Sequence, residues 1–428
     1  MQYEPLKSLY HAYRSAEYSA EVEKRRNSYS TLDFSINIKD FKTHVEHPAF
    51  LVCDWEMLCL METIASHTMH INSLFIKLPQ VARDYYVKKC LVDEIQMTND
   101  IEGIHSTRKE INETIDTINK DDRQKKRFSG MIKKYDIMLK NKESDIPIFT
   151  STDVRKLYDE IVMDEVHSKD FPDGMIFRKD TVFVASKTGQ ERHEGVFPES
   201  KIIEYMERSL YILQDDSIPL LVRVGIFHYL FGYIHPFYDG NGRMNRFISS
   251  YVLFKEYNAL VGLSISRILK ENREAYYRSF RICNDGKNAG DITPFVISFL
   301  SFIEKAAESV REQLTIGISQ INYYQSMILQ NLNMMECKTD REIKNTHSLL
   351  MLFVQNALFA DDPFTITDLA NYANMSETTL RKELTKLTDV VGIPIIIEKG
   401  KRPIHMKIDL DRFDAFLKEL NDKNDQTS

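Results

Sequence analysis

The spacing of hydrophobic positions divides the chain into long helical stretches and one short extended stretch. From FLVCDWEMLCLMETIASH, which begins at Phe50, to about Ile118, apolar residues recur three and four positions apart, a spacing typical of helices. Helical spacing returns in FTSTDVRKLYDEIV, where Ser151 or Thr152 is expected to cap the helix, and then in SKIIEYMERSLYIL and PLLVRVGIFHYLFGYI. These stretches predict a mainly α protein.

One stretch between these helices has a different period. Residues 180–186, DTVFVAS, together with the residues up to HEGVFPES, predict a short β-hairpin that turns at Thr188-Gly189. Two other segments are more polar. Residues 1–48 mix charged and aromatic residues and are expected to form a partly ordered N-terminal extension, and the charged stretch Lys120 to Lys142 is expected at the surface.

A different unit is expected toward the C-terminus. The helical connector SVREQLTIGISQINYYQSMILQNL leads to TITDLANYANMSETTLRKELTKL, which predicts two short helices, and then to IPIIIEKGKRPIHMKI, which predicts a hairpin with a basic turn. Two helices followed by such a hairpin indicate a winged helix-turn-helix. Its boundary is expected between about residues 310 and 345.

Composition narrows the class of protein. The chain has 428 residues, enough for two or three domains, and its 15 glycines and 12 prolines are few, which favours helices with short connections. The net charge of −7 at pH 7 gives no reason to expect nucleic-acid binding by the chain as a whole.

The location expected for the chain is the cytoplasm, without a membrane partner. Its polar start lacks the apolar core of a signal peptide, and no apolar run is long enough to span a bilayer. The cysteines are odd in number and scattered, which favours a reducing compartment over a disulfide framework or a zinc site. They are Cys53, Cys59, Cys90, Cys283 and Cys337.

The stretch HPFYDGNGRMNR, residues 235–246, carries the candidate chemistry. Pro236 is expected to end the preceding helix at His235, and the next helix is expected to begin at about Gly242 or Arg243. The turn DGNG therefore precedes a helix N-terminus, where glycines let backbone N–H groups point inward and the helix dipole adds partial positive charge. Such a turn suits a phosphate.

The side chains around this turn favour phosphate chemistry. Arg243 and Arg246 lie three apart on one helix face and, side by side, suit a polyphosphate better than a single carboxylate. Asp239 is placed for a hard divalent cation, and His235 can take a proton from an attacking hydroxyl. The alternative is an ordinary helix–loop–helix turn with capping glycines and surface arginines, which accounts for a bare GxG but poorly for the whole stretch.

The same stretch resembles the Fic family motif, HPFx(D/E)GNGRxxR, at every defining position. The resemblance extends to FHYLFGYIHPF before the motif, to FRKDTVFVAS and HEGVFP, which look like the family's flap hairpin, and to YYRSFRICNDGKNAGDITPFVISFL, which resembles its closing helices. It covers residues from about 50 to 305 and implies a helical Fic core with a short β-hairpin flap.

The resemblance implies protein adenylyl transfer, in which a target Ser, Thr or Tyr hydroxyl attacks the α-phosphorus of ATP and pyrophosphate leaves. Carried over by position, His235 is the general base, Asp239 holds Mg²⁺, and Phe237 supports the loop from the core. The residues implied to bind phosphates are Gly240, Asn241, Gly242, Arg243 and Arg246, with Asn241 also counted as catalytic.

A second stretch, TNDIEG at residues 98–103, resembles the family's inhibitory motif, (S/T)xxxE(G/N). Thr98 and Glu102 are four apart on one helix face, and Gly103 is a plausible C-cap. The resemblance implies that Glu102 pairs with Arg246 and takes the place of the γ-phosphate. The alternative is an ordinary surface glutamate at a helix end. In some relatives this glutamate helps water to remove AMP, and for this chain the point stays open.

Three further features have an ordinary interpretation beside a functional one. His228 is expected to be packed and hydrogen-bonded rather than a ligand, and His193 is either a surface residue or a contact for nucleotide or target. The flap is expected to dock an extended target segment by strand addition, although it could be a plain lid. Its docking residues are Thr181, Val182, Phe183, Val184 and Ala185, within a segment that ends at Ser186.

The C-terminal unit is the rival source of function. Ser376 is expected to cap a recognition helix. Three cations of this helix and three of the wing suit contacts with DNA phosphates. The acidic residues among them dilute this charge, and many winged helices bind protein instead. The cations are Arg381, Lys382, Lys386, Lys399, Lys401 and Arg402, and the acidic residues are Asp361, Asp362, Asp368 and Glu377.

The expectation is therefore an adenylyltransferase with five segments, restrained by Glu102. The alternative is a DNA-binding regulator whose core senses nucleotide. Self-modification and a homodimer are left open. The segments are an N-terminal extension (1–48), a helical region with the inhibitory helix (49–145), the Fic core (146–305), a helical connector (306–345) and a winged-helix-like domain (346–428).

Overall fold

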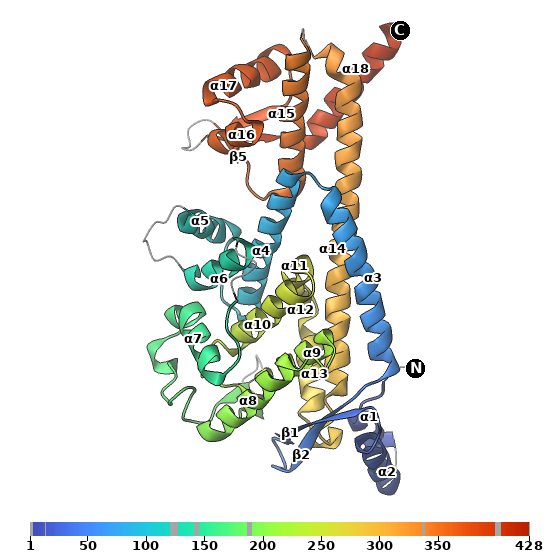
Figure 1. Cartoon of the computed structure of the whole chain (residues 1–428), viewed down its shortest axis with the longest axis vertical. Helices are drawn as coiled ribbons and strands as arrows, with labels where there is room; N and C mark the ends of the chain where they lie inside the picture. The colour runs from blue at the N-terminus through green and yellow to red at the C-terminus, as the bar shows by residue number, and fades with distance from the viewer. Residues whose placement is uncertain are drawn as a thin grey trace. The chain divides into compact units, whose positions relative to one another are not determined.

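The computed structural model confirms a mainly helical protein with small antiparallel sheets (Figure 1). It describes residues 3–12, 14–119, 127–140, 145–185, 191–335, 339–398 and 404–427. Several predicted features lie outside these ranges. They are the hairpin turn at Thr188-Gly189, the flap residue Ser186, the wing cations Lys399, Lys401 and Arg402, Cys337 and part of the charged stretch Lys120 to Lys142.

The chain folds into two compact units. The first consists of Met1–Thr68 and Leu91–Val310, and the second of Met69–Cys90 and Arg311–Ser428. The chain passes from one unit to the other within three helices: α3 (Trp55–Lys77), α4 (Gln80–Glu102) and α14 (Thr293–Asn331). No helix of the described residues is long and apolar enough to cross a membrane.

The centre of the first unit is α9 (Leu220–Ile234), which packs against α8 (Glu199–Gln214) and α10 (Asn241–Glu256). Every residue of α9 except Leu220 and Gly232 is buried, as expected of a helix that is hydrophobic on all sides. The loop between α9 and α10 contains the first half of the HPFYDGNGRMNR stretch and α10 the second half, so this buried helix positions the candidate chemistry.

Shorter helices surround this centre, and one of them corrects a predicted cap. The cap of α7 is Thr150, not Ser151 or Thr152: its Oγ1 accepts a hydrogen bond from Asp153 N at 3.2 Å, and Thr150 N donates to the Asp153 carboxylate at 3.1 Å. This reciprocal pair satisfies two free N–H groups at once. The helices are α5 (Arg108–Asn119), α6 (Ser129–Lys140), α7 (Ser151–Ile161), α11 (Ala259–Gly262), α12 (Ile265–Glu271) and α13 (Arg273–Cys283).

The N-terminal residues are more regular than the sequence suggested. They form α1 (Leu6–Ala12), α2 (Ser15–Arg26) and an antiparallel hairpin of β1 (Thr31–Lys39) and β2 (Glu46–Val52). The helical pattern predicted from Phe50 therefore begins only at Trp55. The overlooked signal is the alternation in β1, where Phe34, Ile36 and Ile38 are buried.

The predicted flap hairpin is present as β3 (Phe183–Ala185) and β4 (Glu191–Glu194), which pair antiparallel. It follows α7 and two short 3₁₀ turns, η1 (Met163–Glu165) and η2 (Ser168–Asp170), in the first unit.

The second unit contains the two short helices and the hairpin that the sequence predicted, together with one further strand. The strands form an antiparallel sheet in the order β5-β7-β6. Ser376 caps α17 as predicted, since its Oγ accepts from Thr379 N at 3.2 Å. The winged helix-turn-helix assignment stays a prediction. The elements are α15 (Asp340–Phe359), β5 (Phe364–Thr365), α16 (Ile366–Ala373), α17 (Glu377–Thr385), β6 (Ile395–Glu398), β7 (His405–Ile408) and α18 (Leu410–Thr427).

Candidate functional site

The loop between α9 and α10 has two residues in the left-handed region of the backbone. Helix α9 ends at Ile234, and His235, with φ 52° and ψ 62°, caps it as predicted. Gly240, with φ 79°, is the N-cap of α10, which begins at Asn241, one residue earlier than expected. These turns bring the imidazole of His235 and the N-terminus of α10 to the same cleft.

The loop is held by the packing of Phe237 and by hydrogen bonds of the Asn241 side-chain amide. Phe237 is fully buried, stacks on Tyr158 with 3.8 Å between ring centroids, and meets Phe177 edge to face at 5.4 Å. Asn241 accepts from Phe237 N at 2.9 Å and donates to Phe237 O at 2.7 Å. Asn241 therefore holds the shape of the loop with both ends of its side chain.

Arg178, which the sequence analysis missed as a functional residue, holds the other end of the loop. It is 0 % exposed, and its Nε donates to His235 O at 2.9 Å while its Nη2 donates to Val196 O at 2.8 Å. Burial lowers the pKa of Arg178 to about 10, so the side chain stays charged at neutral pH. The available signal was its place in FRKD, beside the flap.

His235 is a neutral imidazole at physiological pH. Burial, followed by the repulsion that protonated His193 and Arg178 exert on a protonated ring, lowers the pKa of His235 to about 3. An uncharged imidazole has a free lone pair and can accept a proton from a hydroxyl. His235 lines a cleft of about 1650 Å³, larger than the roughly 300–1,000 Å³ of ordinary small-molecule sites.

Arg246 is bound by the candidate inhibitory motif in the way that the sequence suggested. Its Nη2 donates to Glu102 Oε1 at 2.6 Å and to Thr98 O at 3.1 Å, and its Nε donates to Thr98 Oγ1 at 2.8 Å. Burial alone would raise the pKa of Glu102, but the Arg246 charge and hydrogen bond hold it below its ordinary value. The pair is thus a charged one.

The Glu102 carboxylate also lies over the glycine loop. A Cβ built on Gly242 would come within 2.0 Å of Glu102 Oε1 and 3.0 Å of Arg246 Nη1. An anionic oxygen therefore already occupies the space above the first turn of α10, where the helix dipole and the guanidinium favour negative charge.

Helix α4, which carries Thr98 and Glu102, is held in place independently of Arg246. The buried Glu94 accepts from Ser266 N at 2.9 Å and from Ser266 Oγ at 2.5 Å, and burial raises its pKa to about 7. At the other end Gly103, with φ 78°, ends the helix as predicted, and Ile104 N closes it on Asn99 O at 2.9 Å.

The two motif arginines share a helix but have different partners. Arg243 Nη1 donates to Glu165 Oε2 at 2.7 Å, and Glu165 Oε1 accepts from Phe128 N at 3.0 Å. Burial raises the pKa of Glu165 even though Arg243 opposes this. Among the described residues, Nε and Nη2 of the buried Arg243 have no hydrogen-bond partner, and such buried donors are costly unless a ligand or water satisfies them.

Asp239 is the only predicted metal ligand, and its surroundings suit a phosphate-bound ion. Its side chain is exposed, Oδ1 accepts from Gly240 N at 2.6 Å, and its backbone O accepts from Tyr158 OH at 3.2 Å. No group of three or more His, Cys, Asp or Glu among the described residues could hold a metal by itself. Mg²⁺ commonly binds through one carboxylate together with phosphates and waters, so a single aspartate fits such a metal.

The other two candidate histidines, His228 and His193, are packed in the core and hydrogen-bonded. His228 is fully buried, with Nδ1 2.8 Å from Ser249 Oγ and Nε2 2.7 Å from Tyr276 OH, as the packed interpretation predicted. His193 is also buried, with Nε2 2.6 Å from Tyr233 O. Of the predicted flap residues, Val184 lines the cleft and Phe183 is exposed.

Comparison with known proteins identifies part of the chain. Residues 148–253 match the Fic/DOC family model, so this region is a Fic domain. Among curated proteins, the chain is similar to Protein adenylyltransferase Fic of Drosophila ananassae (27 % identity, 37 % of this chain and 29 % of the relative) and of Drosophila mojavensis (29 % identity, 32 % and 24 %). It thus spans under a third of the length of these relatives.

Two solved structures are also similar. A Fic family protein from Desulfovibrio desulfuricans has a TM-score of 0.49 at 19 % identity, covering 84 % of this chain and 97 % of that one. Fic-1 from C. elegans has a TM-score of 0.42 at 16 % identity, covering 60 % and 74 %. Likeness at this level supports no functional conclusion.

A first prediction concerns the glycine that begins α10. Gly240 and Gly103 both have φ near +80°, but a Cβ at Gly240 would lie 2.4 Å from Val162 Cγ1, whereas nothing lies within 4 Å of one at Gly103. Both Gly→Ala changes force a left-handed alanine, at about 1 kcal/mol. We expect Gly240→Ala to lower the free energy of unfolding, measured by urea denaturation, by about 1–3 kcal/mol more than Gly103→Ala does, because the side chains packed against Gly240 must also shift. Equal losses would contradict the crowded loop.

A second prediction concerns the charge of His235. Nitrogen chemical shifts of labelled histidines, assigned by comparison with His235→Ala, should show a neutral His235 ring down to pH about 5, because its folded pKa is about 3. The unfolded chain takes up this proton near pH 6.5, so the residue lowers stability as the pH falls below that value. A His235 titration midpoint near 6.5 in the folded chain would show that the ring is not protected from protonation.

Proposed function

We propose that this chain, which contains a Fic domain, is a protein adenylyltransferase that transfers AMP from ATP to a hydroxyl side chain of a target protein. The observation that carries the proposal is the meeting of a neutral base, a helix N-terminus and a guanidinium in one cleft: His235, Gly242 and Arg246 all line it. A base, a phosphate cradle and a charge clamp are the three parts that such a transfer needs.

In the proposed reaction, His235 accepts the proton of the target hydroxyl as its oxygen attacks the α-phosphorus of ATP. The new bond joins that oxygen to the phosphorus, and the bond to the pyrophosphate oxygen breaks, so that pyrophosphate leaves with the electron pair. The ring is neutral and has a free lone pair for this proton, and a nearby anion strengthens it as a base, since negative charge raises a pKa that burial has lowered.

The phosphates would lie where Glu102 now lies. The backbone N–H groups of Asn241 and Gly242 begin α10, and Arg246 lies beside them, while the N–H of Gly240 donates to Asp239. Arg243 would use the N–H groups that have no partner among the described residues, while Glu165 keeps the guanidinium in place. Asn241 contributes by holding the loop through Phe237.

Asp239 would hold Mg²⁺ at the exposed edge of this cradle. The ion, when bound, supplies positive charge that orients the phosphates and offsets the charge that builds up on the leaving group. The chain's own contribution is to fix Asp239 through the Tyr158 hydroxyl and the Gly240 amide.

Glu102 would restrain the enzyme by competition. While its carboxylate is paired with Arg246, the γ-phosphate loses a cationic partner and meets a like charge. Hydrogen bonds to charged groups contribute about 1.5–3 kcal/mol each, and 1.4 kcal/mol is a factor of ten. Release of one such contact would therefore change productive ATP binding by about ten- to a hundredfold.

The alternative, a DNA-binding regulator acting through the second unit, has less support. Two of the cations expected to meet phosphates face carboxylates instead: Arg381 lies 3.7 Å from Glu377, and Lys386 lies 3.4 Å from Glu342. Partial neutralisation weakens the electrostatic attraction on which DNA binding depends.

The function is tested with labelled ATP. Glu102→Gly protein, incubated with a cell lysate, Mg²⁺ and ATP labelled in the α-phosphate, should label lysate proteins that mass spectrometry identifies as carrying AMP on hydroxyl side chains. His235→Ala in the same background should label nothing yet bind ATP with unchanged affinity, because the base acts on the hydroxyl and not on the phosphates. If no protein in the lysate carries AMP, the proposal is overturned.

The restraint is tested by a four-protein comparison. We expect Glu102→Gly to label about ten- to a hundredfold more than the unaltered chain at limiting ATP. Arg246→Ala should be inactive, and the double variant should be nearly as inactive as Arg246→Ala alone, because it removes the clamp together with the inhibitor. If Glu102→Gly labels no more than the unaltered chain over a range of ATP concentrations, the proposed competition is wrong.

A further inference from the structure

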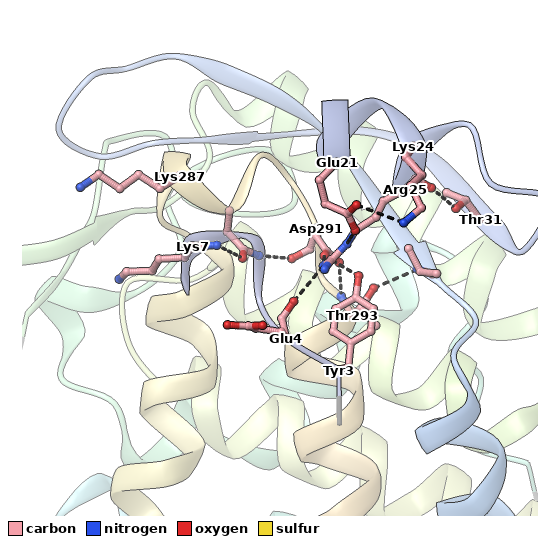
Figure 2. Close-up of polar contacts among 12 residues, drawn as sticks. Tyr3, Glu4, Lys7, Glu21, Lys24, Arg25, Thr31, Lys287, Asp291 and Thr293 are labelled. Atoms are coloured by element: carbon pink, nitrogen blue, oxygen red, sulfur yellow. Dashed lines mark hydrogen bonds and ion pairs between the residues drawn. The ribbon is translucent and has the colours of Figure 1, made fainter. Parts of the chain in front are cut away.

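The N-terminal arm, defined as residues 3–12 and 14–52, is anchored to the Fic-domain unit by a buried carboxylate. Asp291, which is 0 % exposed, accepts from Tyr3 OH at 2.7 Å and lies 3.3 Å from Arg25 Nη1, and Figure 2 shows both arm residues pointing at it. Thr293 N donates to its other oxygen at 2.9 Å. A buried carboxylate requires such partners, so the arm and the core depend on each other.

Backbone pairing and an apolar cluster strengthen this anchor. Phe50 N donates to Gly290 O at 3.0 Å, and Ile292 N donates to Phe50 O at 2.9 Å. Leu6 and Leu9 of α1 pack with Phe50 and Ala289 into one buried cluster. The arm is therefore a fixed wall of the unit and can position a ligand.

The arm forms one side of the cleft that contains the candidate active site. The cleft extends from His235 and Arg246 to residues of α1, α2 and the turn between β1 and β2, among them Tyr10, Tyr18 and Lys42. Its volume of about 1650 Å³ exceeds the usual range for one small ligand. Space remains for part of a macromolecule beside a nucleotide.

The arm also touches the flap. Lys39 Nζ pairs with Glu194 Oε2 at 2.8 Å, and the ring of Phe41 lies 6.3 Å from that of Phe183. The two hairpins therefore meet next to the cleft. A segment that adds to the flap strand β3 would continue toward the β1–β2 turn and the arm.

The charge of the cleft is opposite to that of the chain. Seven Lys or Arg side chains and five Asp or Glu side chains line it, a balance of +2 in a chain with net charge −7. An acidic chain that gathers positive charge in one cleft favours anionic groups there.

Three cations on the arm's side of the cleft are available for an anionic ligand. Among the described residues, none of them has a carboxylate within ion-pair distance. Arg26 donates to Ala289 O at 2.7 Å, and its Nε is buried without a partner. Lys287 lies over the ring of Tyr10, 4.9 Å from its centroid, and Lys42 is exposed in the β1–β2 turn. Cations without a paired carboxylate suit carboxylates on an extended segment.

We propose that the N-terminal arm, together with Lys287 next to it, docks an acidic segment of the target protein, adjacent to the hydroxyl that receives AMP. The inference rests on the proposed function and adds a substrate preference to it. Acidic side chains flanking the modified residue pair with Lys42, Lys287 and Arg26, while the segment's backbone runs along the flap. The nucleotide uses the other end of the cleft, at α10.

The test uses short synthetic peptides with a central Ser, Thr or Tyr whose flanking residues are glutamate, alanine or lysine. In the Glu102→Gly background, glutamate-flanked peptides should be labelled with kcat/KM about tenfold above lysine-flanked ones, through KM and not kcat, with a difference that shrinks at high salt. Lys42→Glu, Lys287→Glu and their double variant should remove or reverse this preference.

The matched control is Lys156→Glu, which makes the same charge change at an exposed position of α7 outside the cleft lining and should preserve the preference. ATP affinity, measured by calorimetry, should be the same in all variants. Equal labelling of acidic and basic peptides, or a loss of ATP affinity that parallels the loss of labelling, would overturn the docking inference. So would a failure to label any peptide while lysate proteins are still labelled. Absence of labelling in both lysate and peptides would instead defeat the proposed function.

Discussion

A guanidinium that is 1 % exposed needs an anion, and this need organises the candidate site. Arg246 is buried on the first turns of α10, and a buried cation without a partner costs several kcal/mol. The Thr98 and Glu102 side chains of α4 meet this need across 148 and 144 positions of sequence. The end of α4 therefore meets α10 at one charge, while Glu94 holds the same helix on Ser266. Any ligand that displaces Glu102 must bring an anion of its own, and in the proposed function the γ-phosphate of ATP is that anion.

The second motif arginine shows how the same residue type serves a different purpose nearby. Arg243 has a carboxylate partner from η1, and Glu165 in turn caps the backbone at Phe128. That contact leaves two of its nitrogens without a partner among the described residues. Two nitrogens of Arg246, Nε and Nη2, are thus bonded to α4, whereas one nitrogen of Arg243 is bonded to Glu165. In the proposed mechanism, ATP would compete with Glu102 for Arg246. It would also supply partners for the two nitrogens of Arg243 that have none among the described residues.

The loop that carries His235 is held rigidly between α9 and α10. The Phe237 ring under the loop, the Asn241 amide within it and the Arg178 guanidinium behind it hold His235 in a left-handed conformation that few non-glycine residues adopt. The arm extends this rigid frame beyond the loop, because Asp291 and Phe50 tie it to the same unit. A cleft with fixed walls keeps the base, the phosphate cradle and the proposed docking surface at constant separation.

The sequence by itself determined what depends on neighbours in the chain. The His235-Pro236 helix end, the flap hairpin, the Ser376 cap and the Thr98, Glu102 and Gly103 spacing were predictable because hydrophobic periodicity, proline and glycine act over a few residues. The Glu102–Arg246 pair was predictable only through the family resemblance. Tertiary structure alone decided the rest. Arg178, Glu165 and Asp291 act through partners that are 57, 78 and up to 288 positions away, and no local pattern marks such partners. The arm was underestimated for the same reason: its short helices and strands are stable because they pack on the core, not because of their own propensity.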